Sequence, residues 1–359
     1  MRRASHPKIR ATVERAVELW KAGEKVLIFC HYRATGRALR QHISARLDAE
    51  IIEAGRRQLG VSGESVREEL EQIGKRFFDK DGLLYREVDK SLNRIVGQFS
   101  DFDKEQSESM VEVVRRFLRT PSFLVRYFDL TQTDYARAFA DAIERQDVGG
   151  FSLSRRIENF SRFLAERCIN VERNQYLDAL KSIQTGTHTG HDVAATLGEG
   201  DEAGPVEKAL LLPNGRLANG QVSADVRQKL LLAFNTPLFP EILIASSVLA
   251  EGVDLHLSCR YVIHHDLCWN PSTLEQRNGR VDRFGSMAEQ IGEPINIYLP
   301  YVAATQDEKM YRVVRDREKW FDIVMGEKYT ADDALTDRQA QRIPLPPVVH
   351  RELTLKLGI

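Results

Sequence analysis

Three polar side chains near the end of the chain have types and spacing that suit the binding of an anion. Gln276, Arg280 and Arg283 are four and three residues apart, which places them on one face if this segment is helical. Gly279 between the arginines removes side-chain bulk, so two guanidinium groups aimed the same way could hold a polyanion such as a triphosphate. The alternative is an ordinary solvated helix whose arginines pair with neighbouring carboxylates.

A second group of candidate residues follows the short apolar run EILIAS, which we expect to be a buried strand. Ser246 ends this run, and Gly252 and Asp254 come shortly after it. Glycine allows close approach of the backbone to a ligand. Asp254 offers an acceptor that suits a ribose hydroxyl or an arginine. We therefore expect a ligand-facing turn at the carboxyl end of this strand.

The elements that must position these residues form an α/β pattern. A helix, the apolar strand VLIFC and a second helix open the chain, and further strands are predicted where short apolar runs recur, at 208–213, 241–246, 261–266 and 295–300. Helical segments lie between them. Strands that alternate with helices predict a layered α/β domain with its ligand near the carboxyl ends of the strands.

The middle of the chain has a different character. Its apolar residues have helical spacing from Glu64 to Gln184, and Thr120-Pro121 and Ser152 look like helix starts. We therefore expect a large all-helical insertion. It ends in a Gly-rich stretch that reads as a flexible linker. His188 and His191 lie there without further ligands, so no metal site is expected.

Composition narrows the class of protein. The 359 residues carry 51 basic and 52 acidic side chains, and 42% are hydrophobic, as in a globular protein. No run approaches the roughly 18 apolar residues of a membrane helix. The four cysteines form no C-x-x-C pair and read as buried thiols, so we expect a cytoplasmic protein. The first 50 residues carry eleven basic and five acidic side chains, either a phosphate-facing surface or a solvated helix face.

Taken together, the motifs resemble motifs V and VI of superfamily-two helicases. The pattern is Ser-x5-Gly-x-Asp after a strand, then D-L-x-W-N-P, then E-Q-R-x-G-R-x-x-R-x-G, and it looks especially like the Swi/Snf-related and RapA-like double-stranded-DNA translocases. VLIFCHYRATGRAL resembles motif IV, and TQDEKMYRVVRDREKWFDIVMG resembles the helix that closes the second RecA-like lobe in that group. The resemblance covers roughly residues 8–55 and 206–327.

The resemblance implies a fold and a division of the chain. The fold is a RecA-like parallel sheet sandwiched by helices and interrupted by the helical insertion. Residues 1–55 and 206–305 would form the two parts of the helicase C-terminal lobe. Residues 56–205 would be the insertion and linker, and residues 306–359 a closing helix and tail.

The resemblance also implies roles for matching positions. In such enzymes ATP and Mg²⁺ bind between two RecA-like lobes, and the second lobe supplies arginines to the γ-phosphate. The residues that match are, for catalysis, Arg280 and Arg283, the latter the better candidate for the arginine finger; for nucleotide binding, Gln276, Gly279, Gly252 and Asp254; and for nucleic-acid binding, Ser246, His31 and Arg33. The RapA-like form of the motif favours duplex DNA.

Two departures from the family pattern shape the functional expectation. Ser286 stands where many Swi/Snf relatives have Gln, and the chain contains neither a G-x-x-x-x-G-K-[ST] phosphate loop nor a metal-binding acidic motif. We therefore expect the second motor lobe of an ATP-dependent helicase or translocase. Its partner would be an N-terminal ATPase lobe, in cis or in trans, that holds the Mg²⁺ ligands, and the chain alone would not hydrolyse ATP. The alternative is a non-catalytic nucleic-acid- or protein-binding module derived from such a lobe.

Overall fold

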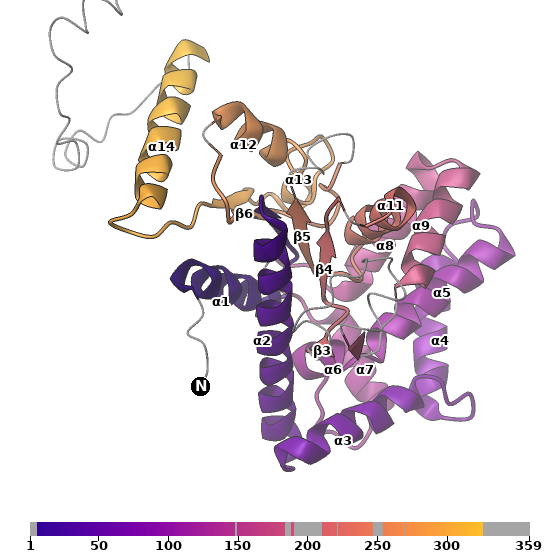
Figure 1. Ribbon diagram of the computed structural model, residues 1–359. Coiled ribbons are helices and arrows are strands. Elements are labelled where there is room, and N and C mark those ends of the chain that lie inside the picture. Colours follow the sequence, from indigo (N-terminus) through magenta and orange to yellow (C-terminus); the bar gives the residue numbers. More distant parts are fainter. Residues whose placement is uncertain are drawn as a thin grey trace, which may run out of the picture. The chain divides into compact units, whose positions relative to one another are not determined.

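A five-stranded parallel sheet organises the first part of the structure (Figure 1). Its strands are β1 (Val26–Cys30), β4 (Gly215–Ala218), β5 (Ile242–Ser246), β6 (Tyr261–His264) and β7 (Asn296–Tyr298), in the spatial order β4-β5-β1-β6-β7. Every residue of β1 and β5 is buried, because helices cover both faces of a parallel sheet. This is the fold class that the sequence predicts, a RecA-like α/β sheet with surrounding helices and a helical insertion.

The structure is a computed structural model that describes residues 6–147, 149–183, 188–189, 210–220, 222–246, 254–268 and 270–325. The chain divides into two units, residues 1–312 and residues 313–359. In the second unit the structure describes the continuation of helix α14 (Gln306–Met325).

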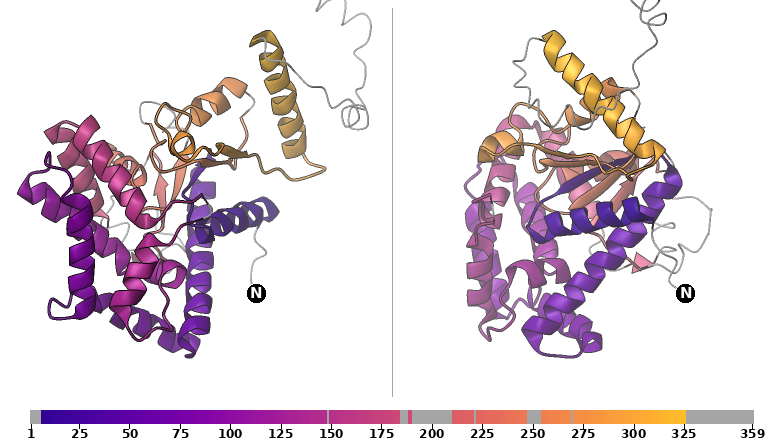
Figure 2. Two further views of the ribbon diagram at one scale, coloured as in Figure 1. Left: turned by 180° about the vertical axis from the view of Figure 1, so that it is seen from behind. Right: turned by 90° about the vertical axis from the view of Figure 1, so that its left-hand side faces the viewer.

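Helices α1 (Pro7–Lys21), α2 (Arg33–Leu59) and α11 (Ala224–Phe234) pack against the sheet. Helix α2 starts the connection from β1 to the edge strand β4, whereas α11 leads from β4 back to β5. Because crossovers between parallel strands are right-handed, these two helices lie on opposite faces. Helix α1 packs against α2 and β1 (Figure 2). Two short helices, α12 (Pro271–Asn278) and α13 (Met287–Ile291), follow β6.

The insertion is helical, as predicted. It contains α3 (Gly63–Arg76), α4 (Leu83–Val96), α5 (Lys104–Leu118), α6 (Pro121–Tyr127), α7 (Tyr135–Glu144), α8 (Leu153–Arg167) and α9 (Asn170–Ser182). Both predicted helix starts are confirmed. Ser152 caps α8 by accepting a hydrogen bond from the Arg155 N–H at 3.2 Å. Pro121 opens α6, although the Thr120 hydroxyl donates to the Phe117 carbonyl at 2.6 Å instead of capping the helix.

One predicted strand takes a different place. Of residues 208–213 the structure describes 210–213, and among these β3 (Leu210–Leu211) is extended and pairs antiparallel with β2 (His188–Thr189), outside the main sheet. The main sheet ends instead on β4, whose sequence Gly-Arg-Leu-Ala carries no β-branched residue. This strand forms because β5 and α2 lie alongside it, which a local pattern does not reveal.

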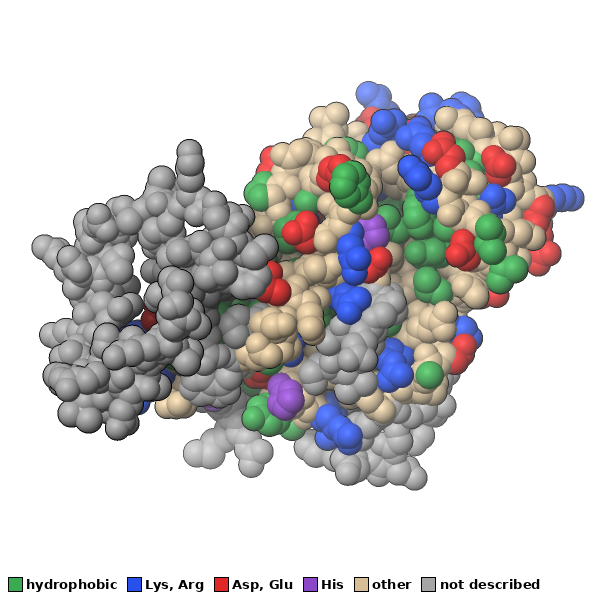
Figure 3. Space-filling model, turned by 90° about the horizontal axis from the view of Figure 1, so that it is seen from above, with side chains coloured by type: hydrophobic (Ala, Val, Ile, Leu, Met, Phe, Trp, Pro, Cys, Tyr) green, Lys and Arg blue, Asp and Glu red, His purple; other side chains and the backbone are tan. Residues whose placement is uncertain are grey.

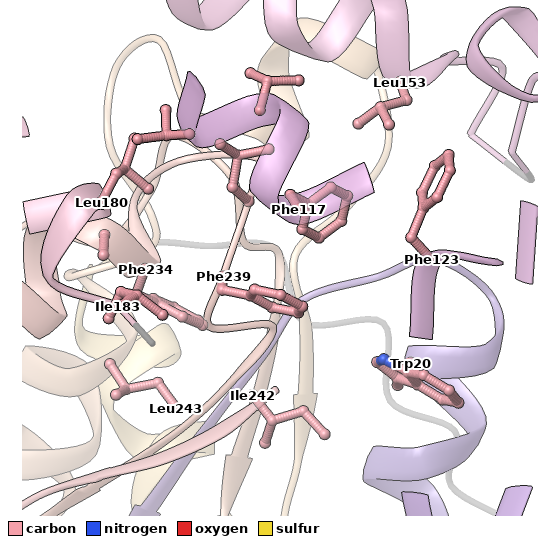
Figure 4. Packing of buried hydrophobic residues seen from close by; sticks show 14 of the residues in the cluster. Trp20, Phe117, Phe123, Leu153, Leu180, Ile183, Phe234, Phe239, Ile242 and Leu243 are labelled. Carbon is pink, nitrogen blue, oxygen red and sulfur yellow. The ribbon is translucent and has the colours of Figure 1, made fainter. Parts of the chain in front are cut away.

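The insertion and the sheet share one hydrophobic core. Phe117 of α5 meets Phe239, just before β5, with ring centroids 4.9 Å apart. Trp20 of α1 lies near Phe123 of α6 in the same cluster (Figure 4). Helix α2 also joins the two parts, because its 27 residues run from the end of β1 to contacts with α3 and α6. The predicted boundary at residue 55 falls inside this helix.

A buried carboxylate connects four elements at the amino ends of the strands. Glu241, just before β5, accepts hydrogen bonds from the Trp20 indole at 2.7 Å and the Asn214 amide at 2.6 Å, and it pairs with Arg126 of α6. Arg126 in turn lies 4.4 Å above the Trp20 ring and donates to the Trp20 carbonyl at 2.9 Å. Insertion, helix α1 and sheet therefore meet at this carboxylate.

A buried lysine lies at the same edge of the sheet. Lys25 Nζ donates to the carbonyls of Phe234, Thr236 and Leu238 at 2.8, 2.5 and 2.7 Å, just after helix α11. Phe234 is the last residue of α11, and Thr236 and Leu238 lie beyond it, so helix bonds do not satisfy these carbonyls and the lysine does. Burial lowers the pKa of Lys25 to about 7, and the Glu241 carboxylate opposes part of this shift.

We expect Glu241→Ala to destabilise the protein by about 3–5 kcal/mol, because it leaves the Arg126 guanidinium buried without its carboxylate. The free energy of unfolding in urea measures this loss. Glu14→Ala is the control, since Glu14 is 65% exposed and makes only a 3.9 Å pair with Arg10. Equal stability of the two variants would contradict the role of Glu241.

Lys25 should make stability depend on pH. Its pKa is about 7 in the folded state and 10.5 when exposed, so between these values the unfolded chain binds one more proton than the folded chain. This group therefore makes the free energy of unfolding rise with pH across that window, by at most about 1.4 kcal/mol per pH unit. Urea titrations at several pH values should show a smaller rise for Lys25→Met than for the wild type. Parallel pH profiles would count against this assignment.

Candidate functional site

Several predicted site residues lie at the carboxyl edge of the sheet. Ser246 ends β5 and is paired in register with Cys30, the last residue of the neighbouring strand β1. His31 follows β1, and its N–H donates to the Asp266 carboxylate at 2.7 Å, just beyond β6. The ends of three adjacent strands thus bring His31, Ser246 and Asp266 together. Figure 3 views the molecule from above, where basic side chains cross the described surface in a broken line.

The three residues predicted to face nucleic acid differ in exposure. His31 and Arg33 are exposed, and Arg33 opens helix α2. Ser246 is buried, and its Oγ has no hydrogen-bond partner within the described part of the chain. Sequence reasoning did not single out Tyr32, which is 64% exposed and packs edge-to-face on His31 with ring centroids 5.0 Å apart. The sequence signal that could have identified Tyr32 is its place as an aromatic residue between His31 and Arg33.

An ion pair joins Asp254, predicted to line the nucleotide cleft, to Arg283, the better candidate for the arginine finger. The Arg283 guanidinium lies 3.0 Å from Asp254 Oδ1, and Arg283 Nε also donates to the Gly279 carbonyl at 2.8 Å. Both charged side chains are nearly half exposed, at 46% and 45%. Such an exposed pair adds little stability, so its main effect is to orient the guanidinium. Gly252 lies outside the described residues.

The two candidate arginines lie just beyond a helix. Helix α12 ends at Asn278, with Gly279 as its C-cap residue. The N–H groups of Val281 and Asp282 both donate to the Asn278 carbonyl at 2.9 Å, so a further helical turn follows the end of α12. Of the three residues expected on one helical face, Gln276 lies on the exposed surface of α12, whereas Arg280 is half-buried in the turn that follows and Arg283 lies beyond it.

Arg277, which the sequence did not mark, is buried beneath this site. Its guanidinium lies 5.1 Å from the centre of the Phe29 ring, and its Nη1 makes a long 3.4 Å contact with the Asp266 carbonyl. Nε and Nη2 have no hydrogen-bond partner in the described structure. Buried polar atoms without partners are rare in native proteins and occur at functional sites. Arg277 therefore marks this edge of the sheet as unusual.

The neighbouring histidine is neutral. His264 stacks on Phe29 with ring centroids 5.5 Å apart and bonds the Asn278 side chain through Nε2 at 2.8 Å. Burial lowers the pKa of His264 to about 4, so its charge does not change near neutral pH. This hydrogen bond fixes Asn278, the last residue of α12, and thereby the start of the arginine turn.

Three of the four predicted buried thiols are buried, whereas Cys268 is partly exposed. Cys30, Cys168 and Cys259 are buried, and burial raises the pKa of the Cys30 and Cys259 thiols to about 12. A protonated thiol is a poor nucleophile and a poor metal ligand.

Within the described residues no three His, Cys, Asp or Glu side chains gather to hold a metal ion. The helices described here also include none long and apolar enough to cross a membrane.

Several basic side chains in the first 50 residues are buried or have acidic partners. Lys25 is buried, and several other basic side chains form ion pairs, which agrees with a solvated helix face more than with a phosphate-facing surface. The pairs are Lys8 with Asp307, Arg10 with Glu14, Arg15 with Glu18, and both Lys21 and Arg46 with Glu50.

Comparison with known proteins supports a helicase C-terminal lobe. Residues 213–285, from the start of β4 through the arginine turn, match the family described as helicase conserved C-terminal domain. A stretch of 99 residues is 34% identical to a protein named uncharacterized ATP-dependent helicase YqhH, from Bacillus subtilis (strain 168). This stretch covers 28% of the chain but only 16% of that relative, so the chain matches about a sixth of its length. The segment 213–285, which includes Asp254 and Arg283, is therefore similar to a helicase C-terminal domain.

Proposed function

We propose that the chain is the second motor lobe of an ATP-dependent helicase or double-stranded-DNA translocase of the Swi/Snf-related or RapA-like type. Residues 1–55 and 206–305 form the lobe, and residues 306–359 contain its closing helix. The observation that carries this proposal is the ion pair between Asp254 and Arg283, which presents a half-exposed guanidinium at the ligand-binding edge of the sheet. The similarity of residues 213–285 to helicase C-terminal domains supports it.

The described residues fit one half of an ATP site. Arg283 can reach a γ-phosphate that another lobe holds, while Asp254 and the Gly279 carbonyl set the direction of its guanidinium. Gln276 lies on helix α12, and Arg280 lies in the turn between this helix and Arg283. No phosphate loop occurs in the sequence and no acidic cluster in the described structure, so we assign the phosphate loop and the Mg²⁺ ligands to the N-terminal lobe. Bound ATP with Mg²⁺ supplies the phosphoanhydride bond that is cleaved.

The proposal gives Arg283 an electrostatic role. Charge spreads over the equatorial oxygens of the γ-phosphoryl group as it is transferred, and a planar guanidinium placed against these oxygens stabilises that charge. Before the lobes close, Asp254 holds the same guanidinium by one ion pair at an exposed site. This pair is weak enough to be exchanged for a phosphate contact.

The nucleic-acid contact is assigned to the ends of β1 and β5. His31, Tyr32 and Arg33 are exposed at the start of helix α2, where backbone N–H groups and a basic side chain favour phosphate. Ser246 lies at the end of the next strand and is the least accessible of the predicted residues. We propose duplex DNA as the nucleic acid that this edge contacts.

Arg283 should be essential for turnover but not for folding. We expect no ATP hydrolysis by the chain alone, and hydrolysis once an N-terminal ATPase lobe encoded in the same or the neighbouring reading frame is supplied. In that complex, Arg283→Ala should reduce kcat by about 10³-fold or more. Arg283→Lys should restore little, because a point charge does not replace the planar fork. The rate of phosphate release in the presence of duplex DNA measures hydrolysis by the chain alone, by the complex and by the two variants.

Arg155→Ala is the matched control, since Arg155 is 53% exposed and ion-paired with Glu158, yet lies on the insertion. Its kcat should equal that of the wild type. Robust hydrolysis by the isolated chain would contradict the need for a second lobe. Salt-dependent DNA binding that neither nucleotide nor the second lobe alters would favour the non-catalytic binding module instead.

A further inference from the structure

Phe284, the residue after Arg283, is exposed to an unusual degree. Its side chain is 97% accessible, more than any other large apolar side chain in the described part of the chain. Single exposed apolar residues are common on protein surfaces. A phenylalanine that is almost fully exposed beside a candidate catalytic arginine nevertheless calls for an explanation from its surroundings.

The turn that carries Phe284 is held in place by hydrogen bonds. The Gly285 N–H donates to the Glu289 carboxylate at 2.6 Å, and the Gln290 amide donates to the Gly285 carbonyl at 2.9 Å. Gly285 has a φ of 75°, a left-handed conformation that favours glycine. The phenylalanine is therefore presented by a preorganised turn, and a partner that covers it need not order the turn first.

Phe284 borders an open hollow of about 590 Å³, which we call the Phe284 hollow. Its apolar lining is formed by Phe284, Ala288, Pro294 and Ile295. Its charged lining is formed by three exposed acidic residues, Asp282, Glu289 and Glu293, and by Arg283, so acidic side chains predominate in it. An apolar centre with a charged rim is the arrangement of a protein-binding surface, and the acidic rim fits a partner whose facing surface is basic.

We infer that the Phe284 hollow is the surface on which the N-terminal ATPase lobe docks, with Phe284 as its apolar anchor. The inference rests on the proposed function of Arg283. Arg283 and Phe284 both line this hollow, so a lobe whose ATP meets the Arg283 guanidinium there also faces Phe284. Docking would bury the phenylalanine and position the arginine in the same step.

The test compares two exposed apolar residues in the complete motor. Phe284→Ser should weaken binding of the N-terminal ATPase lobe at least tenfold, as expected for an aromatic anchor. Leu83→Ser is the matched control, because Leu83 is 73% exposed but lies on α4 of the insertion, and it should leave the affinity unchanged. Titration calorimetry gives the two dissociation constants, and thermal unfolding establishes that both variants are folded.

Three outcomes separate the docking inference from the proposed function. If Phe284→Ser binds the lobe as tightly as Leu83→Ser does, the docking surface is elsewhere, and the role of Arg283 is untouched. If Arg283→Ala keeps its hydrolysis, the proposed function fails, whatever the affinities are. If the chain alone sediments as a dimer that Phe284→Ser dissociates, a second copy occupies the hollow and the inference is wrong.

The acidic rim provides an independent arm of the test. Asp282→Lys reverses one rim charge next to Arg283, and we expect it to lower the rate constant for association with the lobe at low salt. The difference from the wild type should shrink as salt screens the charges. An unchanged association rate at low salt would show that the rim does not face a basic surface.

Discussion

The buried carboxylate of Glu241 holds together parts of this molecule that are far apart in the sequence. It sits where β5 begins and receives an indole from α1, an amide from the segment before β4 and a guanidinium from the insertion. A buried charge is tolerated only when such partners surround it, and losing one of them leaves the others unsatisfied. The position of the insertion and the assembly of the sheet therefore depend on the same group.

The two ends of the sheet have opposite character. At the amino ends, Glu241, Lys25 and the buried pair of Glu24 with Arg260 at 2.7 Å form a tightly bonded network. At the carboxyl ends, Arg277 and Ser246 keep buried polar atoms without partners among the described residues, and Arg283 is held by an exposed ion pair and one hydrogen bond to a backbone carbonyl. At the amino edge most of these polar groups bond to one another and stabilise the fold, although Glu24 Oε2 is buried without a partner among the described residues. The carboxyl edge has bonding capacity left for ligands.

Much of the fold could be predicted from sequence, because its signals are local. Strands β1, β5, β6 and β7 are short apolar runs, and the insertion shows helical spacing over its whole length. Strand β4 escaped prediction because its Gly-Arg-Leu-Ala sequence becomes a strand only beside β5. The end of α12 escaped for a similar reason, since Asn278 is bonded to His264 from a strand that precedes the helix. The motif arginines were found by their spacing and by the resemblance to a helicase motif, although of Gln276, Arg280 and Arg283 the helix α12 contains Gln276 alone.

The sequence by itself determined the α/β pattern, the helical insertion, and a motif with arginines, an aspartate and glycines. Only the tertiary structure decided their environments. Arg277 and Arg283 are six residues apart and chemically identical, yet the first is buried against Phe29 and the second is nearly half exposed beside Asp254. Phe284 is exposed, whereas Phe29 is buried in the central strand. The burial and the pairing of a side chain depend on segments that are distant along the chain, and a local sequence pattern does not reveal those segments.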